Sequence, residues 1–283
     1  MSVQQHSLPV ADGPDQAAVI NATLPVYVGD GLVMDPTWAR EFGARLSETY
    51  CTADPYPHVV MNNFLPGSLV EAILRNFPAA PVPTRKRLIM PAECNEYVRR
   101  IFGFFNSAAV LSFLEGLTGI EGLIPDPHFE GGGFHEIGCG GKLELRNDSR
   151  PHSNPRLNRR LILQIYLNKN WEQDYRGHLE LWDKSAKQKV RDIAPLFNRC
   201  VVFNTGRDSY HGYPDPLNVP ANRTRKSMAL CYYTVSERFC DVTPAKPCAL
   251  TPKSRNHFSL AEVLPPMLYR ALRTMKHRVK PPR

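Results

Sequence analysis

The sequence predicts an α+β fold in which N-terminal helices buttress an antiparallel sandwich or barrel of β-strands. Two observations lead to this prediction. Before about residue 120, apolar residues recur at helical spacing, and from about residue 129 short β-branched and alternating runs follow one another without helical patterns between them. The chain has 283 residues, 42% hydrophobic and 22% charged, which is enough apolar material for a core and excludes a mainly disordered chain.

The predicted helices lie in three stretches. Residues 36–49 start with proline and carry apolar residues at helical spacing. Ser68 and Glu71 have the spacing of a capping box, which predicts that a helix begins there. Residues 95–117 are rich in Phe and Leu and predict a buried helical stretch that breaks near Asn106.

The predicted strands are short runs separated by Asn, Asp, Gly and Pro. One strand is expected early, over residues 56–64. The regular spacing of the later runs is typical of an antiparallel sandwich or barrel. These later strands are expected near residues 134–137, 142–148, 159–168, 177–183, 199–204 and 224–234.

Composition divides the chain into three parts. Residues 1–30 are polar and lack periodicity, which predicts a flexible lead-in, and residues 31–250 are expected to form one domain. Residues 251–283 are expected to form a basic C-terminal helix or tail. No apolar run reaches the roughly 18 residues of a membrane span, and the first residues lack the apolar core of a secretion signal. The seven cysteines include no CxxC pair, which indicates reduced thiols and a cytoplasmic location.

The net charge of +8 is concentrated in residues 252–283. This segment has eight basic residues against Glu262, so the rest of the chain carries only +1. A nearly neutral body argues against a nucleic-acid partner. The basic segment is expected to dock on the body's own surface, and the alternative is attraction to an acidic partner or an anionic membrane. Its basic residues are Lys253, Arg255, Arg270, Arg273, Lys276, Arg278, Lys280 and Arg283.

Five motifs in the second half of the chain occur in a specific order. They are RRLILQIYLN (159–168), RGHLELWD (176–183), PLFNRCVVFNT (195–205), SYHGYPDPL (209–217) and TRKSMALCYYT (224–234). Together they resemble the iron(II)/2-oxoglutarate-dependent oxygenases, in particular the prolyl-hydroxylase-like branch, over about residues 56–236. The resemblance implies a double-stranded β-helix, or jelly-roll, with the site in its open mouth. It also implies Fe(II) and 2-oxoglutarate, and an amino-acid-like or small-molecule substrate.

The resemblance assigns roles to several residues. His211 matches the distal histidine that holds the metal, and Arg225 matches the residue that binds the distal carboxylate of 2-oxoglutarate. A guanidinium suits this task because its fork donates two parallel hydrogen bonds to a carboxylate. Tyr166 and Ser227 are candidates to share that carboxylate, although ordinary strand packing is an equal alternative for both.

One departure concerns the first metal ligands. The resemblance places a His-x-Asp pair where the sequence has Arg146, Asn147 and Asp148, so Asp148 takes the carboxylate position and Arg146 the histidine position. Arginine has no acceptor lone pair and cannot ligate iron. Three readings stay open: His152 or His135 replaces the missing ligand, Arg146 pairs with Asp148 in a metal-free binding module, or iron binds through two protein ligands. We rank an oxygenase with an unusual site first and a pseudo-oxygenase second.

A second departure lies at Arg176 and Gly177, where relatives carry two glycines before the HLELW strand. His178 alternates with Glu180 and Trp182 along this strand, which is typical of an exterior strand residue. The sequence therefore predicts a structural role for His178.

Overall fold

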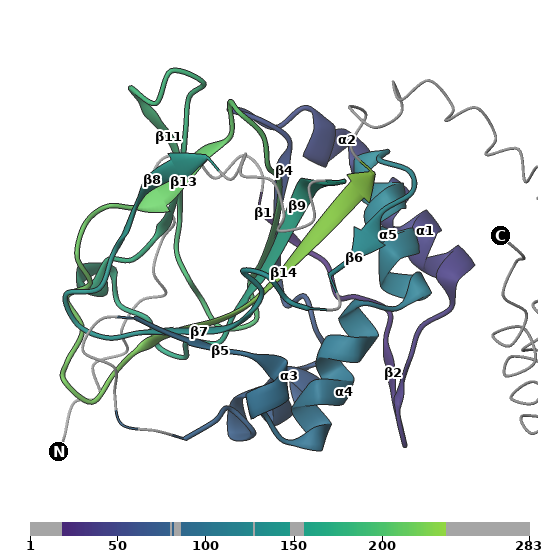
Figure 1. Ribbon diagram of the computed structural model, residues 1–283, viewed down its shortest axis with the longest axis horizontal. Helices are drawn as coiled ribbons and strands as arrows, with labels where there is room; N and C mark the ends of the chain where they lie inside the picture. Colours follow the sequence, from purple (N-terminus) through teal and green to yellow (C-terminus); the bar gives the residue numbers. More distant parts are fainter. Residues whose placement is uncertain (1–18, 80, 82–85, 127, 148–155, 236–283) are drawn as a thin grey trace, which may run out of the picture. The chain divides into compact units, whose positions relative to one another are not determined.

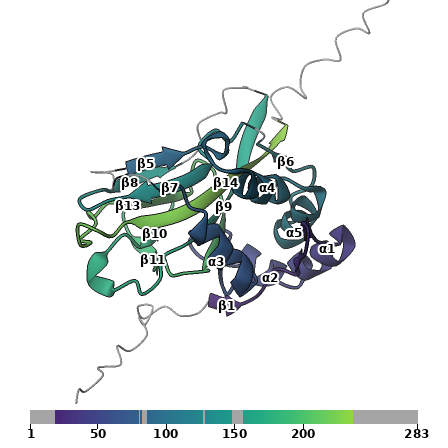
Figure 2. The same cartoon turned by 90° about the horizontal axis from the view of Figure 1, so that it is seen from below.

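The computed structural model describes residues 19–79, 81, 86–126, 128–147 and 156–235. Two β-sheets face each other, and the helices gather on the outer side of the larger one (Figures 1 and 2). This arrangement confirms the predicted α+β jelly-roll with N-terminal helices. The basic segment 251–283 lies outside the described residues.

The larger sheet is mainly antiparallel and the smaller sheet entirely so. The larger has the order β1 (Val19–Asn21), β4 (His58–Asn62), β12 (Cys200–Asn204), β9 (Leu157–Tyr166), β14 (Arg225–Val235), β7 (Gly133–Ile137) and β5 (Lys86–Ile89), with β6 (Ile124–Pro125) paired to β14. The smaller has the order β11 (Lys189–Ile193), β10 (Leu179–Trp182), β13 (Tyr210–Tyr213) and β8 (Leu143–Asn147). β2 (Tyr27–Val28) and β3 (Leu32–Val33) form a separate hairpin.

Alternation along the strands of the larger sheet builds two apolar layers. In β12, Cys200 and Val202 pack toward the helices, whereas Val201 and Phe203 pack toward the smaller sheet. Successive side chains of a strand point to opposite faces, so one strand contributes to both layers. A strand buried on both faces explains why the sequence of β12 reads as continuously apolar.

The helices are α1 (Pro36–Ala44), α2 (Ser47–Cys51), α3 (Gly67–Arg75), α4 (Glu96–Phe105) and α5 (Ala108–Thr118). The Asp35 side chain caps α1 by accepting a hydrogen bond from the backbone of Trp38, and Asn95 caps α4 in the same way. The predicted break near Asn106 is confirmed, since α4 ends just before it. Within the described ranges no single helix is long and apolar enough to span a bilayer, and only α4 and α5 together, bent by 41°, reach that length and composition.

Two helix predictions are wrong in detail. The stretch 36–49 forms two helices, α1 and α2, because the first ends at Ala44. α3 begins at Gly67 after Pro66, and no side chain caps it. The capping box predicted for Ser68 is therefore absent, since Ser68 already lies within the first turn, and Glu71 instead pairs with Lys169 at 2.6 Å between Oε1 and Nζ.

The six later strands occur close to their predicted positions, whereas several others escaped prediction. β5, β11 and β13 have four or five residues each, and their sequences are polar or contain histidine and glycine. β1, within the expected lead-in, pairs in parallel with β4. Such short segments are recognisable as strands only through their partners in the sheet.

Candidate active site

A cavity of about 200 Å³ lies between the two sheets. Side chains from both sheets line it: Arg225 from β14 and His135 from β7 on the larger sheet, and Arg146, His211 and Tyr213 from β8 and β13 on the smaller. Strand pairing therefore brings together residues that lie up to ninety positions apart in sequence. Lys86 and Leu88 of β5 also line the cavity.

Arg225 lies at the inner end of this cavity and is 1% exposed. Its Nε donates a hydrogen bond of 2.8 Å to the Gly177 carbonyl, and its guanidinium lies over the rings of Tyr166 and Tyr213, at 5.0 and 4.5 Å from their centroids. Its Nη2 atom is buried and has no hydrogen-bond partner among the residues that the structure describes. A buried cation without an acceptor at this atom is costly, so the position favours an anionic ligand.

Tyr166 presents a second donor next to Arg225. The side chain is fully buried, and its hydroxyl has no partner in the described part of the chain. Burial raises the pKa of Tyr166 to about 12, against the opposing effect of the Arg225 charge. The hydroxyl thus keeps its proton at neutral pH and is available as a hydrogen-bond donor.

Ser227 lies directly across from Tyr166 in the pairing of β14 with β9. It is fully buried, and its Oγ accepts a hydrogen bond of 3.0 Å from the Gln164 side chain. Gln164 lines the cavity, and Ser227 and Tyr166 adjoin lining residues without being among them. The geometry thus brings Tyr166 to Arg225 and ties Ser227 to Gln164.

His211 is 4% exposed and lines the same cavity. Its Nδ1 lies 3.3 Å from the Ser209 carbonyl, which can only accept, so Nδ1 carries the proton and Nε2 the lone pair. Its ring packs edge-on to Phe203 at 5.0 Å between centroids. This fixed tautomer is the one suited to coordinating a metal through Nε2.

Arg146 lies directly opposite His211 in the register of β8 with β13. Directly opposed residues of antiparallel strands have Cβ atoms roughly 4.5–5.5 Å apart. A guanidinium therefore sits beside the expected metal ligand. Asp148 and the substitute candidate His152 lie outside the described residues.

His135 lines the cavity from β7, and its Nε2 lies 3.3 Å from the Gly131 carbonyl. Burial, together with the charges of Lys86, Arg225 and Arg146, lowers the pKa of His135 to about 4. It is therefore neutral at physiological pH. Among the described residues, no three His, Cys, Asp or Glu side chains gather closely enough to hold a metal ion.

Sequence reasoning missed two contributors to this site. Tyr213 stacks on Arg225, and the Gly177 carbonyl fixes its Nε. Tyr213 stands two residues after His211, and the period of two in a strand is the signal that places both on the cavity face. The role of a backbone carbonyl such as that of Gly177 leaves no such signal.

Residues 132–233 match the family model described as the 2OG-Fe(II) oxygenase superfamily. This match bears out the resemblance that the sequence motifs carry. The match contains β7 to β13 and most of β14, and so includes the cavity residues His135, Arg146, His211, Tyr213 and Arg225. No curated protein matches the sequence.

Several solved structures are similar to this chain. A prolyl hydroxylase from Trichoplax adhaerens, in complex with a hypoxia inducible factor peptide fragment, is 20% identical with a TM-score of 0.49, and the match covers 74% of this chain and 98% of that one. A prolyl-4-hydroxylase from Pseudomonas putida is 20% identical with a TM-score of 0.45, covering 69% and 99%. HygX from Streptomyces hygroscopicus, with nickel and 2-oxoglutarate bound, is 12% identical with a TM-score of 0.43, covering 62% and 82%.

The superfamily name implies both 2-oxoglutarate and iron, and the residues present fit them unequally. The orphaned Nη2 of Arg225 and the orphaned hydroxyl of Tyr166 are complementary to a carboxylate. The described donors do not make up an iron site, because His211 faces Arg146 where the superfamily pattern needs a second ligand.

Proposed function

We propose that the interior cavity binds 2-oxoglutarate, with Arg225 and Tyr166 anchoring its distal carboxylate. The observation that carries this proposal is the pair of buried donor atoms, Arg225 Nη2 and Tyr166 hydroxyl, that have no partner among the described residues. A carboxylate accepts two or more hydrogen bonds and neutralises the guanidinium. It would therefore satisfy both buried donors at once. The rings of Tyr166 and Tyr213 hold the guanidinium plane in place.

We further propose that the chain is an Fe(II)- and 2-oxoglutarate-dependent oxygenase acting on an amino-acid-like or small-metabolite substrate. The match to the superfamily model supports this proposal, and His211 with Asp148 would hold the metal while Arg146 occupies the first-histidine position. Bound iron would supply the activation of oxygen. The chain's own residues orient the cosubstrate through Arg225, and Phe203 and Leu179 contribute apolar walls that limit water in the cavity.

A specific observation favours a second function. Arg146 is the direct cross-strand partner of His211, so its positive charge would lie close to the position at which the resemblance expects a metal. A fixed cation disfavours a dication nearby and attracts a second carboxylate. On this alternative the chain is a pseudo-oxygenase that binds 2-oxoglutarate, or a related dicarboxylate, without metal.

One experiment separates the two functions. Calorimetry under anaerobic conditions would measure 2-oxoglutarate binding with and without Mn(II) as an inert substitute for Fe(II). A parallel assay in air would follow the conversion of 2-oxoglutarate to succinate with Fe(II). Binding that strengthens with metal, together with succinate formation, supports the oxygenase. Metal-independent binding without succinate supports the alternative, and absence of binding in either condition contradicts both.

A further inference from the structure

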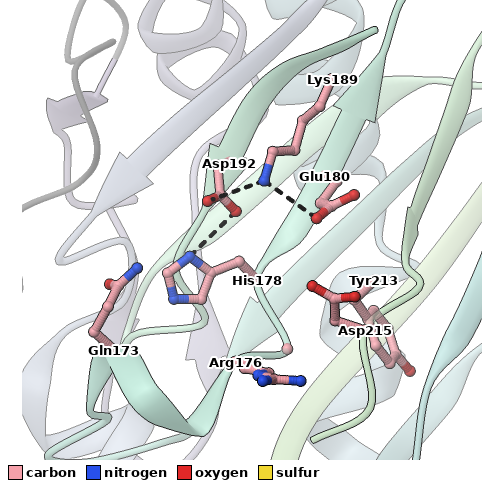
Figure 3. A pocket seen from close by; sticks show the side chains of 9 residues that line it. Gln173, Arg176, His178, Glu180, Lys189, Asp192, Tyr213 and Asp215 are labelled. Atoms are coloured by element: carbon pink, nitrogen blue, oxygen red, sulfur yellow. Dashed lines mark hydrogen bonds and ion pairs between the residues drawn. The ribbon is translucent and has the colours of Figure 1, made fainter. Parts of the chain in front are cut away.

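A second cavity, of about 150 Å³, lies against the turn formed by Arg176 and Gly177 (Figure 3). Gln173, His178, Asp192 and Asp215 also line it. Tyr213 lines both this cavity and the larger interior cavity. The Gly177 carbonyl holds Arg225, so the turn belongs to the wall between the two cavities.

Arg176 adopts a backbone conformation that only glycine adopts readily, with φ 59° and ψ −150°. The turn is held by a hydrogen bond of 3.0 Å from Trp171 Nε1 to the Arg176 carbonyl. Glycine at this position would avoid the strain, so an arginine here indicates a use for its side chain. The guanidinium is exposed at the cavity and makes no hydrogen bond or ion pair within the described ranges.

His178, the residue before β10, lines the same cavity. Its side chain is 10% exposed, and its Nδ1 lies 3.2 Å from Asp192 Oδ1. Figure 3 shows Lys189 bridging Asp192 and Glu180, at 3.5 and 3.3 Å from their carboxylate oxygens. Burial acts to raise the pKa of Asp192, but the hydrogen bond from His178 and the charge of Lys189 outweigh it and lower this pKa. Asp192 thus stays ionised and fixes Nδ1 of His178 as the donor.

The other ring nitrogen of His178, Nε2, is not used by this network. Its Nε2 is buried and has no hydrogen-bond partner among the residues described by the structure. Buried polar atoms are nearly always satisfied in native proteins, by protein, water or ligand. The role predicted from sequence, an exterior strand residue, does not account for this atom.

Asp215 completes the lining from the loop after β13. Its carboxylate makes no ion pair or hydrogen bond with any described residue, including Arg176 in the same cavity. Lys189 already offsets Asp192 and Glu180, so the charged groups of the described lining that are still unpaired are one guanidinium and one carboxylate, and His178 Nε2 lies beside them without a partner. One positive and one negative group, separated across a small cavity, are complementary to a ligand that carries both opposite charges.

We propose that this second cavity binds a small zwitterion, a molecule with both an ammonium and a carboxylate group, of which a free amino acid is the simplest kind. Arg176 receives the carboxylate, Asp215 receives the ammonium group, and His178 Nε2 bonds to one of the polar groups. The site lies outside the interior cavity and uses none of its metal-site residues.

Coupling to the interior cavity follows from the shared wall and rests on the proposed function. A zwitterion that holds Arg176 also fixes the Gly177 carbonyl and hence Arg225 Nε. Binding of the zwitterion is therefore expected to tighten 2-oxoglutarate binding, and by linkage 2-oxoglutarate tightens zwitterion binding by the same factor.

Calorimetry on the full chain tests the site with glycine as the probe. Acetate and methylammonium, which carry one charge each, are the matched half-probes. Glycine is expected to bind at millimolar concentration, and each half-probe to bind about tenfold more weakly. Arg176→Gly and Asp215→Asn should each weaken glycine binding by about tenfold or more. Arg207→Ala and Asp208→Asn remove one positive and one negative charge at exposed positions that line neither cavity. These control variants should leave the affinity for glycine unchanged.

The thermal midpoint of Arg176→Gly provides an internal check. Because glycine relieves the backbone strain, this variant should melt at the same or a higher temperature while losing glycine binding. Loss of binding in a folded, equally stable variant assigns the effect to the side chain. His178→Gln, which keeps a polar atom near the same place, should retain part of the binding.

Several outcomes would overturn the proposal. They are absence of glycine binding, equal affinity for acetate and glycine, and glycine binding that survives Asp215→Asn. Failure of the proposed function shows separately, as absence of 2-oxoglutarate binding while glycine still binds. If both ligands bind but neither changes the affinity of the other, the coupling is wrong and the site remains.

Discussion

Arg146 and His211 are direct cross-strand partners, on β8 and β13 of the smaller sheet, and both line the interior cavity. The pairing puts a permanent positive charge beside a buried histidine whose Nδ1 is held by the Ser209 carbonyl. This relationship is what separates the chain chemically from a superfamily member with the usual two histidines. The choice between the two proposed functions depends on Arg146, and the first prediction addresses this side chain.

Arg146→His should strengthen Mn(II) binding by at least about tenfold, because it removes a repelling charge and adds an imidazole ligand next to His211. Electron paramagnetic resonance of free Mn(II) measures the bound fraction directly. Arg146→Gln is the matched control, since it removes the charge without adding a ligand, and should give a smaller gain. Equal Mn(II) affinity in the wild type and in Arg146→His would show that this strand position does not face the metal.

Arg225→Ala should weaken 2-oxoglutarate binding by at least about tenfold, since charge-assisted hydrogen bonds contribute roughly 1.5–3 kcal/mol. Arg225→Lys should retain part of the affinity as a point charge that lacks the guanidinium fork. Titration calorimetry measures both, with the exposed Arg207→Ala as control. An unchanged dissociation constant in Arg225→Ala would place the anchor elsewhere.

Tyr166→Phe should weaken 2-oxoglutarate binding about two- to tenfold while leaving the ligand-free protein as stable as the wild type or more so. The reason is that the buried hydroxyl has no partner in the described part of the chain, so its removal costs nothing without ligand. Chemical denaturation and calorimetry on the same sample compare the two effects. A clear loss of stability without ligand would mean that the hydroxyl already has a partner.

Gly177→Ala should impair 2-oxoglutarate binding through Arg225. Gly177 has a φ of 70°, and an added Cβ would lie 2.4 Å from Leu217 Cδ2 and 3.1 Å from Arg225 Cδ. Gly140→Ala is the control, because Gly140 has a similar φ of 74° but open space around its Cβ position. Both variants place alanine at a positive φ and lose stability for that reason. Only Gly177→Ala also brings a Cβ against Arg225, so only this variant is expected to lose affinity for 2-oxoglutarate. Equal affinities would mean that the Gly177 turn does not position Arg225.

Stability should fall as the pH is lowered from about 6.5 to about 4, in part because of His135. Its pKa is lower in the folded than in the unfolded chain, so within this window only the unfolded chain binds the proton. The contribution of His135 to stability is fully present above its pKa of about 6.5 in the unfolded chain. It is lost as the pH falls toward its pKa of about 4 in the folded chain. Burial lowers the pKa of His58 too, so it adds to the same trend.

Urea unfolding at several pH values measures this dependence, and His135→Gln should reduce its slope without abolishing it. His128→Gln, at an exposed histidine, is the control. NMR titration of the His135 ring reports its protonation directly. A midpoint near 6.5 would contradict the expected burial of the ring.

The sequence by itself predicted the fold class and the later strands, and the resemblance in its motifs singled out Arg225 and Arg146. Runs such as those of β9, β12 and β14 are long and apolar, so their periodicity is a strong local signal. Arg225 was recognisable because a charge inside an apolar strand needs a partner. Arg146 was visible for a different reason. The resemblance expects a metal-binding histidine at its position, and arginine cannot ligate a metal.

Only the tertiary structure decided which of these groups meet. Strand register placed Arg146 opposite His211, brought the Arg225 guanidinium over the rings of Tyr166 and Tyr213, and joined Ser227 to Gln164 by a hydrogen bond. It also produced the second cavity, which both Arg176 and Asp215 line although 39 positions separate them. The physical reason is that hydrogen-bond satisfaction and burial are properties of contacts between distant segments, so no local pattern in the sequence encodes an atom's lack of a partner.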